Sequence, residues 1–221
     1  QNYFSFYDKY FFASKKLPLR LIYLGLVDHS EKFSNYVKFW KEYFNNAKVF
    51  GINFSDASID NLDEAEIFNV KNLNNFGLEK IFTLNKIKAN IIIDNCDYRS
   101  DKQQFIFDKI FKFLIPGGIY VFQNINPFYM DNAKKKFTIH NNLASNINND
   151  LPIIFSSNIL IDPDLKYSTF SVLLNYCLTK KLESPFISPE NISYLEKNIE
   201  LCNIHNSQLN QKLIIFIKKK K

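Results

Sequence analysis

Short apolar runs, rich in β-branched residues, alternate along the first half of the chain with segments of helical periodicity. Runs of this length and composition are typical of parallel strands buried on both faces; they cover residues 19–26, 48–54, 67–70, 89–94 and 119–122. Apolar residues at three-four spacing predict helices, at 3–12, 33–44, 78–84 and 101–114. Elements in this order predict a doubly wound, Rossmann-like, mostly parallel α/β sheet.

The clearest single unit lies between residues 89 and 129. A strand ending at Asp94 is followed by a helix, a Pro-Gly-Gly turn at 116–118, and a second strand ending at Gln123 and Asn124. In open α/β sheets, ligands bind beyond the carboxyl ends of the strands. We therefore expect these three polar residues to lie on one rim of the sheet, where a ligand would bind.

Beyond residue 129 the periodicity is weaker. Residues 134–150 are polar and rich in Asn, which predicts an exposed loop or lid. An apolar run follows at 152–161, and residues 170–179 are compatible with either a strand or a short helix. A helix is predicted from Pro189 to about Ile199, and two alternating segments near the end predict an antiparallel hairpin, at 200–205 and 212–218.

The chain contains no linker rich in Pro, Gly or Ser, so we expect one domain over residues 1–221. Its expected parts are a helical edge, a cofactor-type core, and a lid or substrate-side segment that includes the hairpin; these cover 1–18, 19–129 and 130–221. A hydrophobic fraction of 46% supplies enough apolar material for a core. The high aromatic content, together with many Asn, Lys and Ile residues, is typical of AT-rich coding bias, with a stacking surface as the alternative.

The formal net charge is +6, and lysine runs at 134–136 and 218–221 contribute much of it. Such runs are usually solvated, although they can also touch an anionic membrane or a polyanion. No basic stripe alternates with aromatic residues on a defined face, so the sequence gives no strong indication of nucleic-acid binding.

Three cysteines without metal-ligand spacing favour a reducing, cytoplasmic setting over a disulfide framework. No apolar window is long enough to predict a transmembrane segment, and no signal-peptide pattern is present at the start. The abrupt start at Gln1 is compatible with a part of a longer chain.

An ordered set of matches carries a family resemblance. It consists of a helix with Trp40, the strand segment 46–53, Ile91-Ile92-Ile93-Asp94-Asn95-Cys96, Gln103, the segment 116–121, and Gln123-Asn124. The set resembles class I S-adenosylmethionine-dependent methyltransferases, and within them the macrolide-sugar and cephalosporin-type O-methyltransferases. The resemblance covers about residues 3–129, and the remainder agrees in topology.

The resemblance implies S-adenosylmethionine as the cofactor. In the family, a glycine-rich turn after the first strand approaches the methionine part, and an acidic residue ending the second strand accepts the ribose hydroxyls. The corresponding positions here are Gly25 and Asn53, and Asp94 and Asn95 follow at the fourth strand. An amide can accept one hydrogen bond and donate another, but it lacks the charge of a carboxylate.

Several positions depart from the family pattern. Tyr23 stands where a carboxylate is usual, and Gln123 and Asn124 replace a Glu-Asp pair that helps to hold a divalent metal. Asn126 and Tyr98 stand where histidines are common. Since Mg²⁺ requires anionic oxygen ligands, and Asp94 is the carboxylate that remains, no metal ligands are assigned and a divalent metal is not expected.

The candidate catalytic residues are Asp94, His29 and Tyr98. His29 lies near the expected cofactor turn and could act as a general base. Tyr98 could position a hydroxyl, although a phenol with a pKa near 10 is a poor base at neutral pH. Asp94 could instead cap the loop after its strand.

Gln123, Asn124 and Asn126 are the candidate substrate-binding residues, with ordinary polar loop positions as the alternative. Two functions follow. The first is methyl transfer from S-adenosylmethionine to a hydroxyl of a sugar or polysaccharide precursor. The second is a catalytically degenerate relative that serves as a binding or assembly module. The expected partner is a small-molecule or glycan acceptor, and a homo-oligomer or further parts of a longer chain are left open.

Overall fold

The computed structural model describes residues 4–25, 30–54, 58–60, 62, 65–70, 75–96, 99–125, 166–207 and 212–221. Seven strands form one sheet in the order β3-β2-β1-β4-β5-β7-β6. Their bounds are β1 Arg20–Gly25, β2 Lys48–Asn53, β3 Ala65–Asn69, β4 Ala89–Asn95, β5 Leu114–Ile125, β6 Ile199–Ser207 and β7 Lys212–Lys219. The first five strands are parallel, and β7 is antiparallel to both β5 and β6. The predicted mostly parallel sheet and the antiparallel hairpin are both confirmed.

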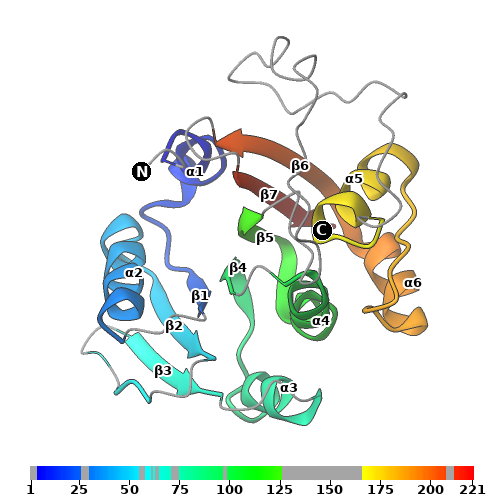
Figure 1. The fold of residues 1–221 in the computed structure, drawn as a ribbon. Helices are drawn as coiled ribbons and strands as arrows, with labels where there is room; N and C mark the ends of the chain where they lie inside the picture. Colours follow the sequence, from blue (N-terminus) through cyan, green and yellow to red (C-terminus); the bar gives the residue numbers. More distant parts are fainter. Residues whose placement is uncertain are drawn as a thin grey trace.

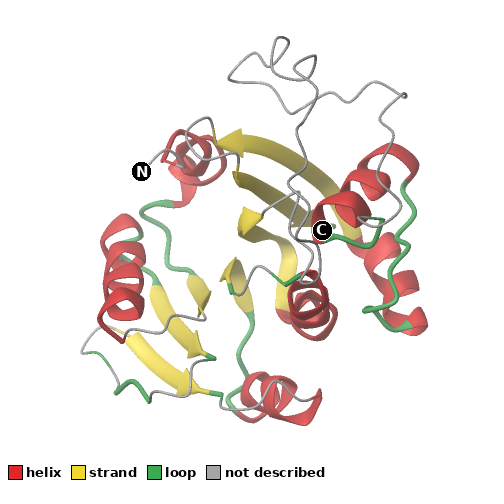
Figure 2. Ribbon diagram, viewed as in Figure 1, coloured by secondary structure: helices red, strands yellow, loops and turns green. Residues whose placement is uncertain are grey.

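Helices cover both faces of this sheet (Figures 1 and 2). On one face lie α1 (Phe4–Phe11) and α2 (Ser30–Tyr43), whose apolar residues join a core cluster with Tyr23 and Ile93. On the other face lie α3 Asn75–Leu84, α4 Ser100–Ile110, α5 Thr169–Thr179 and α6 Pro189–Asn198. The segment that allowed either a strand or a helix is therefore the helix α5.

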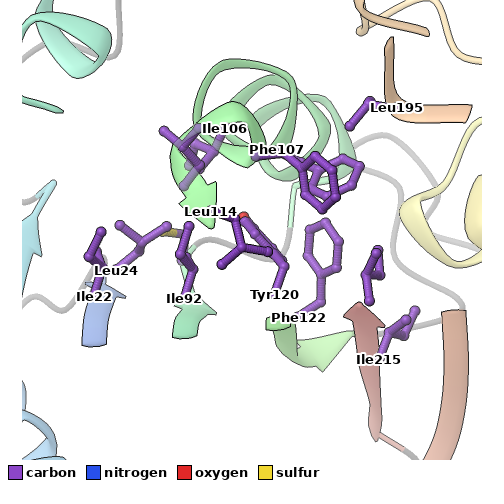
Figure 3. Packing of buried hydrophobic residues seen from close by; sticks show 14 of the residues in the cluster. Ile22, Leu24, Ile92, Ile106, Phe107, Leu114, Tyr120, Phe122, Leu195 and Ile215 are labelled. Atoms are coloured by element: carbon purple, nitrogen blue, oxygen red, sulfur yellow. The ribbon is translucent and has the colours of Figure 1, made fainter. Parts of the chain in front are cut away.

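The two clusters alternate along each strand because successive side chains of a strand point to opposite faces. Ile22 and Leu24 of β1 pack under α3 and α4, together with Ile92, Tyr120 and Phe122 (Figure 3). Leu21, Tyr23, Ile91, Ile93 and Val121 face α1 and α2 instead. Burial of both faces explains why these strands are continuous apolar runs.

The Pro-Gly-Gly segment differs from the expected turn, because it lies inside the span of β5. Ala89 pairs with Leu114 and Ile91 pairs with Ile119, so four residues of β5 face one residue of β4. Gly117 has a φ of 77°, and a Cβ on Gly118 would lie 2.9 Å from the carbonyl oxygen of Asn90. The two glycines thus allow an irregularity in the pairing of β5 with β4. Strand β5 also begins at Leu114, before the apolar run at 119–122.

The predicted lid at 134–150 and the apolar run at 152–161 lie outside the described residues. Between β2 and β3, the described residues 58–60 and 62 form no helix. Ile59 and Leu62 pack there against the cluster below α2. Within the described part of the chain, no helix is both long and apolar enough to cross a membrane.

Candidate functional site

Amide side chains, interrupted by a glycine on β1, form a row across the carboxyl ends of the parallel strands. In the strand register, Asn69 of β3 pairs with Asn53 of β2, which pairs with Gly25 of β1, which pairs with Asn95 of β4. Gln123 of β5 occupies the next position, because the preceding Phe122 pairs with Asp94. Tertiary structure therefore brings together residues that lie far apart in the sequence, and we call this row the amide rim.

Asn53, the candidate ribose contact, is engaged in the protein's own hydrogen bonds. Its side chain is 0% exposed, and its Nδ2 donates to Oδ1 of Asn69 over 2.9 Å. Asn69 in turn accepts from the backbone N–H of Ile59 and donates to the Ile59 carbonyl oxygen. This pair of amides fastens the segment after β2 to the sheet, so the structure gives Asn53 a structural role.

Gly25, the candidate cofactor glycine, lies directly under the ring of Phe33. A Cβ at Gly25 would lie 2.9 Å from two ring carbons of Phe33, and a Cβ at Gly51 on the neighbouring strand would lie 2.8 Å from another. Phe33 belongs to α2 and is fully buried. The missing side chains at both glycines therefore make room for this helix to approach the sheet.

Tyr23 occupies the position at which a carboxylate was expected from the family resemblance. Its hydroxyl oxygen accepts a hydrogen bond from Nδ2 of Asn95 over 2.8 Å, and its ring stacks on Tyr36. Burial raises the pKa of Tyr23 well above its ordinary value. Tyr23 is therefore a neutral, buried phenol that links β1 to β4.

Asp94 faces the opposite side of the sheet from the amide rim. It is 2% exposed, its Oδ2 accepts from the Tyr120 hydroxyl over 2.6 Å, and its Oδ1 accepts from the Cys96 N–H over 3.0 Å. Burial raises the pKa of Asp94, although both hydrogen bonds oppose the shift. Because its two oxygens are already bonded, Asp94 caps the end of β4.

Tyr120, the partner of Asp94, was not among the site residues predicted from the sequence. The available signal is a hydroxyl-bearing aromatic residue in an apolar strand, two positions before the residue that pairs with Asp94. A buried hydroxyl requires a hydrogen-bond partner, and a carboxylate on the neighbouring strand supplies one.

Gln123 has a hydrogen-bonding group that the described residues do not satisfy. Its side chain is half-buried, and its Oε1 is buried without a hydrogen-bond partner in the described part of the chain. Asn95, its neighbour on the amide rim, is also half-buried. Among the described rim residues, these two side chains are therefore the candidates for ligand contact.

The structure does not describe the side chains of the remaining predicted site residues. His29, Tyr98 and Asn126 lie outside the described residues, and Asn124 belongs to β5 without a described side chain. Over the ranges that are described, no three His, Cys, Asp or Glu side chains gather closely enough to hold a metal ion. The described rim can donate and accept hydrogen bonds, but it offers no open carboxylate for a metal.

Comparison with solved structures identifies the fold. The MycE methyltransferase of the mycinamycin biosynthetic pathway, in complex with Mg, SAH and mycinamycin VI, aligns with a TM-score of 0.67 and 17% identity over 99% of this chain. An rRNA methylase structure from Clostridium thermocellum aligns with a TM-score of 0.52 and 14% identity over 100% of this chain and 97% of its own. No protein-family model matches the chain, and no curated protein matches it.

The chain spans about half the length of MycE, since the alignment covers 49% of that protein. At these identities the likeness shows the fold. The chain therefore has the Rossmann-like fold of class I methyltransferases, with the antiparallel β7 between β5 and β6.

Proposed function

We propose that this protein is an S-adenosylmethionine-dependent methyltransferase that methylates a hydroxyl group, on a sugar or a polysaccharide precursor. The observation that carries the proposal is the alignment of 99% of this chain, at a TM-score of 0.67, with MycE, a methyltransferase whose structure was solved in complex with Mg, SAH and mycinamycin VI. Open α/β sheets bind ligands at the carboxyl ends of their strands, which is where the amide rim lies.

The described residues fit such a cofactor at one part of the rim. The unpartnered Oε1 of Gln123 can accept a hydrogen bond from a hydroxyl or amine, and the half-buried Asn95 lies beside it. Asn53 is fully buried and bonded to Asn69, whereas Asn95 is half-buried although its Nδ2 donates to Tyr23. The Phe33 ring packs against Gly25 on the side of α2. We therefore assign contact with the cofactor to Asn95 and Gln123.

Bound S-adenosylmethionine would supply an activated methyl group on sulfur. The role of the protein would then be to hold the acceptor hydroxyl in line with that methyl group. Orientation alone can supply a large share of the rate acceleration. Such a reaction needs few catalytic side chains, which agrees with the small number of open ionisable groups on the described rim.

A metal is not part of this proposal. The MycE structures contain Mg, and Mg²⁺ is usually held by carboxylates and waters. Asp94, the carboxylate near the end of β4, faces the other side of the sheet from the amide rim and is buried and bonded to Tyr120 and Cys96. Mg²⁺ at this position would have to displace both bonds.

A second candidate is a binding or assembly module that keeps the fold without cofactor chemistry. Two contacts motivate it: the ring of Phe33 over Gly25, and the hydrogen bond from the buried Asn53 to the exposed Asn69. They lie at the two positions that the resemblance assigns to the cofactor. The two candidates differ in one measurable property, which is affinity for the cofactor.

Titration with S-adenosylmethionine and with S-adenosylhomocysteine, followed by thermal unfolding and calorimetry, tests the proposal. A methyltransferase should be stabilised by about 2.7 kcal/mol when the ligand is at a hundredfold excess over its dissociation constant. The absence of heat and of any thermal shift at millimolar concentrations of both ligands would contradict methyl transfer and favour the binding module.

A pair of asparagine variants locates the binding. Asn95→Ala should weaken S-adenosylhomocysteine binding about tenfold, the effect of losing one hydrogen bond worth about 1.5 kcal/mol. Asn45→Ala, at an exposed turn position, should leave binding unchanged. A bulky residue at Gly25 is a poor test, because its Cβ would clash with Phe33 and disturb the fold itself. Equal affinities in the two variants would remove Asn95 from the site.

A further inference from the structure

The amino-terminal edge of the sheet carries two adjoining hollows, at the opposite end of the strands from the amide rim. Their volumes are about 380 and 180 Å³, and they share Pro18, Leu19, Asn90 and Ile115. Since β1 and β2 are each six residues long, a rise of about 3.3 Å per residue separates this edge from the rim by roughly 17–20 Å. The hollows therefore lie apart from the candidate site described above.

Three cations line the larger hollow because the parallel strands begin at the same edge. Arg20 is the first residue of β1, Lys48 is the first residue of β2, and the two pair in the strand register. Lys88 immediately precedes β4, and Asn46 and Asn90 add side-chain amides. None of the described residues that line this hollow is acidic.

Most of this positive charge is uncompensated within the described part of the chain. Nζ of Lys48 lies 2.6 Å from the carboxylate of Glu66. Arg20 and Lys88 have no described carboxylate partner, and Nζ of Lys88 lies 5.2 Å from the centre of the Phe113 ring. Like charges on adjacent strands repel and are destabilising. An anion placed between these cations would remove that repulsion.

One of the amides is held in a fixed orientation. The backbone N–H of Arg20 donates to Oδ1 of Asn90 over 2.9 Å, so Nδ2 of Asn90 remains as a donor. The guanidinium of Arg20 can present two parallel N–H groups to one phosphate. Arg20 and Asn90 together therefore offer several N–H donors to an anion in this hollow.

The lysine run at 218–221 adds charge near the same edge, because β7 is antiparallel to β5. A Cβ on Gly117, which lines the smaller hollow, would lie 3.5 Å from Cγ of Lys221. Nζ of Lys219 is engaged with the carbonyl oxygen of Leu114 over 2.7 Å, whereas Lys220 and Lys221 are exposed. Clustered charge of one sign attracts counter-ions and raises their local concentration.

We propose that the larger hollow binds a small molecule bearing a phosphate or diphosphate group. The guanidinium of Arg20 and the ammonium of Lys88 contact its oxygens, and the side-chain amide of Asn90 donates to it. A volume of about 380 Å³ lies within the range of small-molecule sites, roughly 300–1,000 Å³. The site does not depend on methyl transfer, because it lies at the other end of the strands.

Inorganic pyrophosphate is the probe, titrated at low ionic strength and followed by calorimetry and by backbone amide chemical shifts. Saturable binding should move the amides of Arg20, Lys88 and Asn90 and leave those of Gly25 and Asn95 in place. Sodium chloride at equal ionic strength should move none of them. S-adenosylhomocysteine, titrated separately, tests the rim, so the failure of one site is distinguishable from the failure of the other.

Matched variants decide whether the named cations form the site. Arg20→Gln and Lys88→Gln should each weaken pyrophosphate binding at least tenfold, whereas Lys38→Gln, at an exposed position of α2, should change it less than twofold. Thermal unfolding checks that each variant is folded. If Arg20→Gln does not fold, the comparison of Lys88→Gln with Lys38→Gln is sufficient. Tighter binding of ADP than of pyrophosphate would identify a nucleotide, and equal binding would identify recognition of the phosphates alone.

Three results would overturn the proposal. The first is no saturable binding of pyrophosphate at millimolar concentration. The second is equal weakening in the Arg20, Lys88 and Lys38 variants, which would indicate a diffuse basic surface. The third is binding restricted to long polyanions such as RNA or heparin, with steep salt dependence and no localised chemical shifts.

Discussion

His205 illustrates how one buried polar side chain controls the docking of a helix. It is 1% exposed, and its Nε2 lies 2.8 Å from the hydroxyl of Tyr10 in α1. Asn203 donates to the oxygen of the same hydroxyl, which leaves the Tyr10 hydrogen to donate to a neutral His205 ring. Burial lowers the pKa of His205 to about 4, with a smaller contribution from the positive charge of Lys9.

Acid should therefore destabilise the protein through His205. Between pH 6.5 and 4 the unfolded chain binds a proton that the folded protein does not, so the free energy of unfolding falls as the pH falls through this window and is fully restored above it. The expected loss between pH 6.5 and 5 is about 1.6 kcal/mol, because the full slope of about 1.4 kcal/mol per pH unit is reached only below the unfolded pKa. Urea unfolding of the parent and of His205→Phe at both pH values measures it.

The variant isolates the histidine from other groups that titrate. Asp94 acts in the opposite direction, because its raised pKa means that the folded protein gains a proton before the unfolded chain does as the pH falls. His205→Phe keeps the apolar contact with Phe6 and Phe216 but cannot ionise. A parent and a variant with equal losses of stability between pH 6.5 and 5 would show that His205 is not the responsible group.

At the scale of elements, the approach of α2 to the sheet depends on Phe33 and two glycines. The Phe33 ring fills the space above Gly25 of β1 and Gly51 of β2, where any side chain would be within 3 Å of it. Protein interiors are packed at crystal-like density, so a helix can approach this closely only where the facing strands lack side chains. One aromatic residue thus sets the packing of a helix on two strands.

Phe33→Ala should lower the free energy of unfolding by about 3–5 kcal/mol, because the ring is fully buried. Gly25→Ala should cost about 1–3 kcal/mol through overpacking. In the Phe33→Ala background, however, the added methyl group enters vacated space and should cost much less. A double-mutant cycle by urea unfolding measures this coupling.

Phe12→Ala is the matched control, because Phe12 is 73% exposed, and an exposed substitution is expected to change stability by about 0.5 kcal/mol or less. Additive costs at Gly25 and Phe33 would contradict the packing that we describe.

At the scale of the whole molecule, β7 joins the two core clusters. Ile215 and Ile217 belong to the cluster on the face that α3, α4, α5 and α6 cover, whereas Ile214 and Phe216 belong to the cluster on the face of α1 and α2. The sheet is shared by both clusters, so loss of packing on one face removes the support of the other. We therefore expect the two faces to unfold together.

Ile215→Ala should lower the free energy of unfolding by about 2–5 kcal/mol. Trp40, the single tryptophan, is buried in the cluster on the other face, so its fluorescence reports on α2. The fluorescence transition should shift as far as the far-UV circular dichroism transition, as two-state unfolding requires. A shift confined to circular dichroism would instead indicate two independent units.

The sequence was sufficient to predict the order and type of most strands and helices, because their apolar runs and helical periodicity were clear. Continuous apolar runs ended at Gly25, Asn53 and Asp94, and the structure ends or nearly ends its strands there. The hairpin followed from alternation in two segments. The segment from Thr169 to Thr179 remained ambiguous, since a short apolar run fits either a buried strand or a buried helix, and contacts distant in sequence decide between them.

The location of the candidate-site residues on the sheet could be predicted from the sequence, but the partners that each side chain contacts could not. That Asn53, Gly25, Asn95 and Gln123 share one rim follows from parallel strands ending at one edge. Which groups remain open depends on partners far away in the chain. Asn69 engages Asn53 and Phe33 covers Gly25, and no local pattern announces either contact.

The sequence by itself determined the α/β class, the parallel order of the first strands and the amide character of the rim, because these depend on residue type and on spacing along the chain. Tertiary structure decided the face on which each rim residue lies. Asp94 and Asn95 are neighbours in β4, yet one bonds Tyr120 beneath α4 and the other bonds Tyr23 on the side of α2. The pleat of a strand sends adjacent side chains to opposite faces, and only the packing of helices on those faces determines what each side chain meets.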